Sequence, residues 1–222
     1  MTREWFENFC RPRLTEKDRK ILQFIYRQRL VTSKQIRDVF YKKNKSQVQC
    51  NARLHTLENE LYCIKRFYLK TMPGEGKSYA HIVLDRGGYR ALNLDNHNNI
   101  YSKLPSTYKH YLAVNDFCIL ANEKGWGWGI TEYNMDVCIS DIFYEEKRIS
   151  VEIDMGTESH SLLEDKANRY NLLNNIGLII FISNNQKRAD RFISKVYSIQ
   201  KKIAGVFEKQ KDIVDYVTEK LY

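Results

Sequence analysis

Two carboxylates, Glu152 and Asp154, stand two residues apart in the stretch SVEIDMGTES, residues 150–159. They alternate with Val151 and Ile153, which is the pattern of a buried β-strand. Side chains two residues apart on a strand point to the same side of the sheet. Paired carboxylates can hold a hard cation such as Mg²⁺, and a metal-activated water can cleave a phosphodiester. We therefore weigh three hypotheses for this strand: the metal site of a nuclease, the remnant of one, and the polar side of an ordinary sheet.

The charge of the chain is distributed unevenly. Its 222 residues carry 36 Lys and Arg against 27 Asp and Glu, a formal net charge of +9. Residues 1–94 hold 20 of the basic and 9 of the acidic residues, a net of +11, whereas residues 95–222 hold 16 and 18, a net of −2. Such asymmetry indicates a polyanion-binding module joined to a module with another role. We expect residues 1–94 to bind nucleic acid.

The composition also argues against several classes of protein. Hydrophobic residues make up 43% of the chain and aromatic residues 13%, as in globular proteins. The longest apolar run, residues 176–182, is too short to span a bilayer, and the first residues contain no apolar signal core. The five cysteines are scattered without a CxxC pair, which indicates reduced, buried thiols instead of disulfides or a zinc site. These features predict a cytoplasmic protein without a membrane partner.

Residues 1–94 have the pattern of three helices followed by a β-hairpin. Apolar residues recur at helical spacing after Thr15, after Ser33 and from about Ser46, and we expect Thr15 and Ser33 to be N-caps. Two alternating runs then flank the turn PGEG at residues 73–76, which predicts the hairpin. This order predicts a winged helix-turn-helix. In that fold the third helix enters the DNA major groove and the hairpin follows the phosphate backbone.

The third predicted helix buries an apolar stripe and turns a polar side outward. The stripe consists of Cys50, Leu54, Leu57 and Leu61. Amide and guanidinium side chains can make bidentate contacts to base edges, whereas lysines contact phosphates without reading sequence. The residues predicted to face DNA from this helix are Lys45, Gln49, Asn51, Arg53, His55 and Thr56. The lysines predicted to contact phosphates are Lys42, Lys43, Lys70 and Lys77.

The pattern changes after a polar, Asn-rich segment, residues 95–106, which we interpret as a linker. Residues 107–222 then show a helix, three strands, a helix, a strand and a further helix, which predicts an α/β sheet with a crossover helix. Apolar residues at helical spacing over residues 203–221 predict surplus helix and a surface for a second copy of the chain. The predicted fold class is therefore α+β or α/β with two domains, residues 1–94 and 107–222.

This element order resembles the core of the PD-(D/E)xK nuclease superfamily, the restriction-endonuclease-like fold. The resemblance implies an acid on the second core strand and an E-x-K on the third, which together hold a divalent metal. It places the first acid at Asp136 and the E-x-K at residues 152–154, where Asp154 stands in place of the lysine. Lys166 and Arg169, on the next predicted helix, are the cations that could replace that lysine.

Three motifs give a closer resemblance. The stretches LTEKDRKIL at residues 14–22, YKHYLAVND at 108–116, and VEIDMGTES at 151–159 followed by KANRY at 166–170 resemble the replication-relaxation family of plasmids and other mobile elements of Gram-positive bacteria. The resemblance covers residues 14–183. It implies a DNA-binding protein with a degenerate nuclease-like domain, associated with plasmid replication, transfer or their regulation.

Our favoured prediction is a homodimer that binds double-stranded DNA sequence-specifically and regulates transcription, replication or transfer of a plasmid or mobile element. Its degenerate nuclease-like domain serves assembly and has no catalytic residue, no metal and no cofactor. In it, the carboxylates of the strand cap the turn at Gly156 and Thr157 and pair with Lys166 or Arg169. A related hypothesis makes the protein an accessory factor of a replication or transfer complex.

The alternative prediction is a Mg²⁺-dependent endonuclease or nickase that its winged helix directs to a site. Asp136, Glu152 and Asp154 would then be the metal ligands, and Lys166 would be the catalytic cation. A net charge of −2 over residues 95–222 argues against a cleft that grips DNA unaided.

Overall fold

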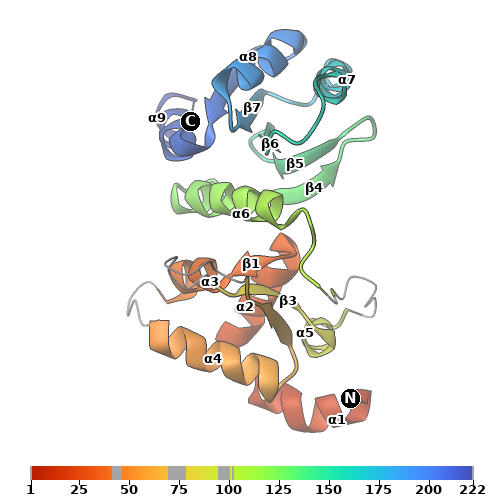
Figure 1. Cartoon of the computed structure of the whole chain (residues 1–222), viewed down its shortest axis with the longest axis vertical. Coiled ribbons are helices and arrows are strands. Elements are labelled where there is room, and N and C mark those ends of the chain that lie inside the picture. The colour runs from red at the N-terminus through yellow and green to blue at the C-terminus, as the bar shows by residue number, and fades with distance from the viewer. Residues whose placement is uncertain (1, 42–46, 70–78, 95–100, 102, 222) are drawn as a thin grey trace. The chain divides into compact units, whose positions relative to one another are not determined.

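The structure is a computed structural model that describes the chain except for residues 1, 42–46, 70–78, 95–100, 102 and 222 (Figure 1). It contains two compact units, residues 1–112 and 113–222. Their boundary lies inside helix α6 (Tyr108–Glu123), so the first turn of this helix belongs to the first unit. Most of the linker predicted at residues 95–106 lies outside the described residues.

The first unit combines helices with a small antiparallel sheet. The three predicted helices are present as α2 (Glu16–Gln28), α3 (Ser33–Phe40) and α4 (Gln47–Asn59). The sheet has the order β1-β3-β2, from β1 (Val31–Thr32), β3 (His81–Leu84) and β2 (Ile64–Phe67). Strands β2 and β3 are the arms of the predicted hairpin, and Ile64 pairs with Leu84. The predicted PGEG turn lies outside the described residues.

The helix starts of this unit follow from side chains that cap them. The Thr15 side chain accepts a hydrogen bond from the Asp18 N–H, and the Asp18 carboxylate accepts one from the Thr15 N–H, so Thr15 caps α2 as predicted. Helix α3 is capped by Thr32 through the same reciprocal pair with Gln35. The prediction of Ser33 as this cap is wrong, because Thr32 still has the extended backbone of β1.

The N-terminal residues and a short helix complete the unit. Helix α1 (Arg3–Trp5) leads through helical turns at residues 6–13 toward α2. Helix α5 (Arg86–Ala91) follows β3 and is capped by Asp85, whose carboxylate accepts a hydrogen bond from the Arg86 N–H. A Cβ added at Gly88 would lie 2.2 Å from the Cys63 carbonyl oxygen. Only glycine at this position therefore allows α5 to pack this closely against Cys63, the residue before β2.

The second unit is built on a five-stranded mixed sheet of order β4-β5-β6-β7-β8. Strands β4 (Ile130–Asn134), β5 (Ile139–Tyr144) and β6 (Ile149–Asp154) pair antiparallel. Strands β7 (Leu178–Ser183) and β8 (Lys201–Val206) continue the sheet in parallel. Helices α7 (His160–Tyr170) and α8 (Gln186–Lys195) connect the parallel strands. The predicted mixture of helices and strands is therefore present in both units.

Strand β8 corrects the prediction of continuous helix toward the C-terminus. Residues 201–206 pair in parallel with β7, with Ile203 beside Ile180. Only the later part of the segment is helical, as α9 (Gln210–Leu221). Apolar residues at 203, 206 and 207 satisfy a helical spacing, but pairing with an otherwise unpaired edge of β7 decides the conformation.

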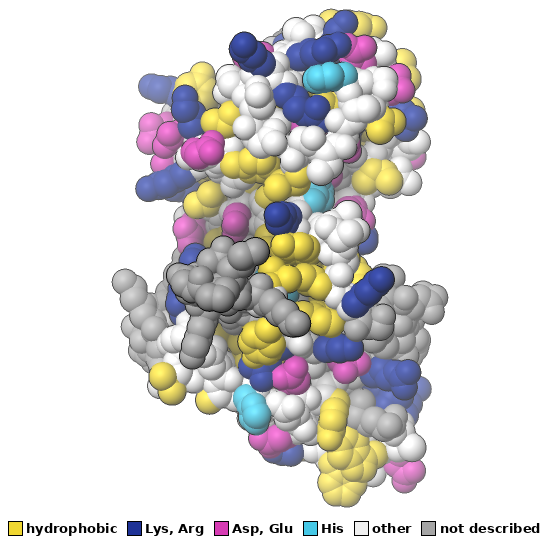
Figure 2. Space-filling view, viewed as in Figure 1, with side chains coloured by type: hydrophobic (Ala, Val, Ile, Leu, Met, Phe, Trp, Pro, Cys, Tyr) yellow, Lys and Arg dark blue, Asp and Glu magenta, His cyan; other side chains and the backbone are white. Residues whose placement is uncertain are grey.

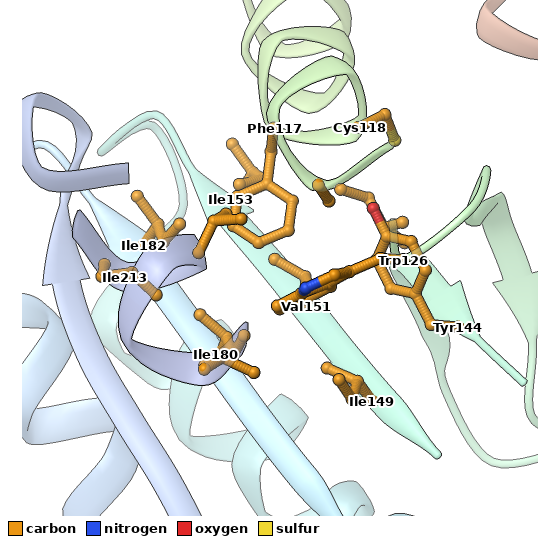
Figure 3. Close-up of a cluster of buried hydrophobic side chains, with 14 of the residues drawn as sticks. Phe117, Cys118, Trp126, Tyr144, Ile149, Val151, Ile153, Ile180, Ile182 and Ile213 are labelled. Carbon is orange, nitrogen blue, oxygen red and sulfur yellow. The ribbon is translucent and has the colours of Figure 1, made fainter. Parts of the chain in front are cut away.

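The sheet lies between α6 and α9 on one face and α7 and α8 on the other (Figure 1), and it separates two hydrophobic clusters. Side chains of α6 and α9 pack on one face, where Phe117 and Trp126 lie near Val151 and Ile153 of β6 (Figure 3). Helices α7 and α8 cover the other face with a cluster that includes Tyr170, Phe181 and Phe192. Along β7 the side chains alternate between the two clusters, with Ile180 and Ile182 in the first and Ile179 and Phe181 in the second.

Helix α9 is part of the core of its own unit. Ile213, Val214 and Val217 are buried against the sheet together with residues of α6. The Trp126 indole N–H also donates to the Thr218 hydroxyl, 2.8 Å away. The interpretation of this helix as a surplus apolar surface is therefore wrong, since its apolar side is already covered.

Two predictions from composition can be compared with the structure. All five cysteines lie among the described residues, where each is buried and outside any disulfide, as predicted. Within the described ranges, every helix is too short or too polar to cross a membrane.

Candidate functional site

The polar side of β6 is buried and faces α7 and α8. All six residues of the strand are buried. Val151 and Ile153 join the hydrophobic cluster beneath α6 and α9. Ser150, Glu152 and Asp154 alternate with them and bond to residues of α7, α8 and β7. The prediction that both carboxylates share one side of the sheet is confirmed.

Glu152 lies at the centre of a hydrogen-bonded chain that joins two strands to α7. It is 1% exposed, accepts a hydrogen bond from the Tyr170 hydroxyl and forms an ion pair with Lys166. The Ser150 hydroxyl lies 2.8 Å from the Tyr170 oxygen and 2.7 Å from the Ser140 hydroxyl of β5. The predicted pairing of Glu152 with Lys166 is therefore present.

Asp141 of β5 belongs to the same cluster and was missed by the sequence prediction. Its carboxylate accepts a hydrogen bond of 2.7 Å from the Ile153 N–H. The antiparallel register that pairs Ile142 with Val151 places Asp141 next to Glu152. The available signal was the position of Asp141 in the middle of an alternating strand, where an acid needs a partner.

The protonation of this cluster is governed by burial and by neighbouring charges. Burial raises the pKa of Glu152 to about 8, the Asp141 carboxylate adds to this, and Lys166 and Tyr170 oppose it. Burial alone would lower the pKa of Lys166, but the carboxylates of Glu152 and Asp141 hold it above its ordinary value. The cluster thus keeps Lys166 charged, and Glu152 binds a proton at a higher pH than an ordinary glutamate does.

Asp154 is held by a different helix from the one predicted. Arg188 of α8 donates to both of its carboxylate oxygens, with 3.1 Å between Nη2 and Oδ1. The Ser183 hydroxyl donates to Oδ2 at 3.0 Å, and the Gly156 N–H donates to Oδ1 at 2.9 Å. The carboxylate therefore caps the turn at Gly156 as predicted. Its cationic partner is Arg188 and neither of the two residues expected on α7, because α8 begins beside the end of β6.

Asp136 is not placed with the other two predicted metal ligands. It lies in the turn between β4 and β5, where it is exposed and has a positive φ of 69°. Its N–H donates to the Asn134 side chain at 3.0 Å. Across the described residues, no group of three or more His, Cys, Asp or Glu side chains is arranged to hold a metal ion. Lys166 does reach Glu152, as the nuclease hypothesis requires.

Helix α4 carries the second candidate site on its outer side. Its exposed residues include Val48, Gln49, Asn51, Ala52 and His55, and Val48 is 77% exposed. The predicted stripe of Cys50, Leu54, Leu57 and Leu61 is buried on the other side. Asn51 accepts a hydrogen bond of 2.7 Å from Gln47, one turn earlier. The outer side is thus polar with small apolar groups between the amides.

Arg53 occupies a different position from the one predicted. Its Nε donates to Asp18 Oδ1 at 2.8 Å, and its Nη2 donates to the Arg13 carbonyl at 3.1 Å. Burial raises the pKa of the Asp18 carboxyl, but hydrogen bonds from Arg53 and Thr15 outweigh burial and bring that pKa below its ordinary value. Arg53 therefore connects α4 to α2, because a buried carboxylate needs a cation.

Of the other predicted DNA contacts, Thr56 and His55 lie on the described part of α4, and five lysines lie outside the described residues. Thr56 is half-buried and donates to Glu60 at 3.3 Å, whereas His55 is exposed and its ring nitrogen lies 3.1 Å from the Asn59 amide. The five predicted phosphate-binding and flanking lysines lie outside the described residues: Lys42, Lys43, Lys45, Lys70 and Lys77.

The fold and these sites define an α+β protein with a helix–sheet unit and a second unit whose central strand carries buried acids. Residues 22–178 match the replication-relaxation family. Because this match covers more than half of the chain, the protein belongs to the replication-relaxation family. Comparisons with curated proteins and with solved structures gave no match.

We predict that Glu152 makes the stability of the chain depend on pH. Its pKa is about 8 in the folded protein against an ordinary value of 4.5, so unfolding releases a proton between these pH values. Raising the pH through this window should therefore lower the free energy of unfolding of the wild type relative to Glu152→Gln, by at most about 1.4 kcal/mol per pH unit. Urea unfolding at pH 5, 6.5 and 8 measures this difference.

Glu145→Gln is the matched control, because Glu145 is an exposed glutamate of the same unit. Glu145→Gln should keep the wild-type fall of unfolding free energy with rising pH, whereas Glu152→Gln should lose most of it. A difference between wild type and Glu152→Gln that stays constant from pH 5 to 8, or that grows in favour of the wild type, would contradict the assignment.

Proposed function

We propose that the protein binds double-stranded DNA through the outer side of α4, and that the first unit is a winged helix-turn-helix. The observation that carries this proposal is the exposed row of Val48, Asn51, Ala52 and His55 on a helix whose other side is buried. The helix lies in the part of the chain, residues 1–94, that holds a net charge of +11. A major groove about 12 Å wide admits one such helix.

The exposed groups on α4 suit contacts to base edges. The Asn51 amide can donate to and accept from adenine at the same time, which gives bidentate recognition. Val48 and Ala52 offer methyl groups for contact with thymine, and neither blocks a close approach. We exclude Arg53 from this proposed set, since its guanidinium is committed to Asp18.

The lysines next to these elements in the sequence would supply affinity. Lys42, Lys43 and Lys45 directly precede α4, and Lys70 and Lys77 lie between β2 and β3. Phosphate neutralisation by lysine releases counterions and gives sequence-independent binding. We propose that these lysines position the protein while α4 selects the site.

Family membership suggests a role in the replication or transfer of a plasmid or mobile element. We propose that the protein is cytoplasmic and acts there as a DNA-binding regulator, and that the second unit serves assembly. An accessory role in a replication or transfer complex would use the same DNA contacts.

The alternative function is a metal-dependent endonuclease, and one arrangement favours it. Asp141, Glu152 and Lys166 bring two acids and a lysine together on adjoining elements, as a nuclease requires. We nevertheless propose that the second unit is not an enzyme. The Glu152 carboxylate is 1% exposed and bonded to Tyr170, so its present position offers no surface to a scissile phosphate.

We predict that Asn51→Ala weakens binding to the preferred site by about tenfold or more, because one bidentate contact contributes roughly 1–3 kcal/mol of discrimination. Binding to unrelated duplexes should change little, since phosphate contacts remain. Fluorescence anisotropy with a footprinted site and a scrambled duplex measures both. Asn168→Ala, at an exposed asparagine of α7, is the control. Equal site affinity for wild type and Asn51→Ala would contradict the proposed role of Asn51.

We further propose that the protein binds DNA as a homodimer. Helix–turn–helix proteins commonly contact two half-sites with two copies related by a twofold axis. Sedimentation velocity of complexes with a footprinted duplex should give the mass of the duplex plus about twice the 26.4 kDa of one chain. A single chain per duplex at every protein concentration would contradict a dimer.

A further inference from the structure

The second unit has a polar pocket that the proposed DNA contact does not use. The pocket has a volume of about 420 Å³ and lies where α7 and α8 begin. Its lining includes Gly156, Asn184 and Asn185. Four further lining side chains are basic or imidazole groups: His160, Lys187, Arg188 and Arg191.

The strand order explains why two helix starts meet at this pocket. Strands β6 and β7 are parallel neighbours, so they end at the same edge of the sheet. Helix α7 follows β6 with Ser159 as its N-cap, and α8 follows β7 with Asn185 as its N-cap. Each helix start carries about half a positive charge and unpaired N–H groups. The end of parallel strands is also where α/β sheets bind ligands.

The charges around the pocket leave a positive excess. Arg188 is neutralised by Asp154, and Arg191 lies 2.7 Å from Glu164. Lys195 is 4.0 Å from the same Glu164, so two cations share one carboxylate.

Two lining cations remain available to a ligand: Arg191, which shares Glu164 with Lys195, and Lys187. Lys187 is exposed and forms no ion pair with any residue in the described part of the chain. The lining itself holds the cations Lys187, Arg188 and Arg191 and no acid. The acidic side chains near the lining are Asp154, Glu158, Glu164 and Asp190, and Asp190 accepts a hydrogen bond from Gln186. The space-filling view shows Lys and Arg side chains around a histidine where α7 and α8 lie (Figure 2). The two helix starts add to this excess.

We propose that this pocket binds a phosphate group. Phosphate combines a double negative charge with several acceptor oxygens, which match a lysine, an asparagine amide and helix N–H groups. The volume of about 420 Å³ also falls within the roughly 300–1,000 Å³ of small-ligand pockets, so there is room for the group that carries the phosphate. That carrier is a nucleotide or the backbone of DNA, and experiment distinguishes them.

This site is separate from the buried acids and from α4. Arg188 lines the pocket and donates a hydrogen bond to Asp154, so its charge is already paired. Lys187 and Arg191 present cations to a ligand. The proposal stands independently of DNA binding by the first unit, because all the described residues that line the pocket belong to the second unit.

The test uses the full-length protein and calorimetric titration with two probes, inorganic phosphate and a 5′-nucleoside monophosphate. Lys187→Ala and Arg191→Ala should each weaken binding about tenfold, since each removes one charge-assisted contact. Lys211→Ala is the charge-matched control, at an exposed lysine of α9, on the opposite face of the sheet. Arg188 is left unchanged, because it neutralises a buried carboxylate.

A third arm identifies DNA as the source of the phosphate. The salt dependence of duplex binding should become shallower by about one in log–log slope for Lys187→Ala if the pocket holds a backbone phosphate. Lys211→Ala should keep the wild-type slope. This readout stays interpretable even if Asn51→Ala has no effect, so the two proposals fail separately.

Tighter binding of the nucleotide than of inorganic phosphate, lost in Lys187→Ala, would support the pocket and assign a nucleotide. A shallower duplex slope in Lys187→Ala would support it and assign DNA. The proposal is wrong if neither small probe binds at millimolar concentration and the duplex slope is unchanged. It is equally wrong if Lys187→Ala and Lys211→Ala behave alike with all three ligands.

Discussion

The need to neutralise two carboxylates buried on one strand fixes much of the second unit. Glu152 and Asp154 are 1% and 5% exposed, and an unpaired charge at such a position costs several kcal/mol. Helix α7 supplies Lys166 and Tyr170 to the first carboxylate, and α8 supplies Arg188 to the second. The same contacts that satisfy the acids therefore define where each helix lies on the sheet.

This constraint also links the acids to the candidate phosphate pocket. Because Arg188 must reach Asp154, α8 begins close to the end of β6, and Lys187 and Arg191 are carried to the same edge. The hydrophobic clusters on both faces then hold the sheet and its helices together. The first unit shows the same principle at smaller scale, since buried Asp18 binds Arg53 and joins α2 to α4.

Local signals in the sequence were sufficient for several features. Thr15 was identified as a cap because capping depends on residues within one turn. The alternation along β6 placed Val151 and Ile153 on one face and the two acids on the other. The pattern after residue 107 likewise indicated the order of elements through α8.

Features that depend on distant partners could not be predicted. Strand β1 has two residues, too few for a pattern, and β8 has helical spacing but is set by pairing with β7. Arg53 lies at the edge of the buried stripe of α4, three residues after Cys50 and four before Leu57, and its orientation depends on the buried Asp18 of another helix. Asp141 required the register of β5 against β6, which no local pattern supplies.

The central claim is that the acids of β6 are structural. The most direct measurement incubates supercoiled plasmid DNA with the wild type, Glu152→Gln and Lys166→Ala in Mg²⁺ and in Mn²⁺. The account predicts that all three proteins leave the plasmid supercoiled, because Glu152 is bonded to Tyr170 and Lys166 beneath the surface. Metal-dependent nicking by the wild type that disappears in both variants would contradict it and establish an endonuclease.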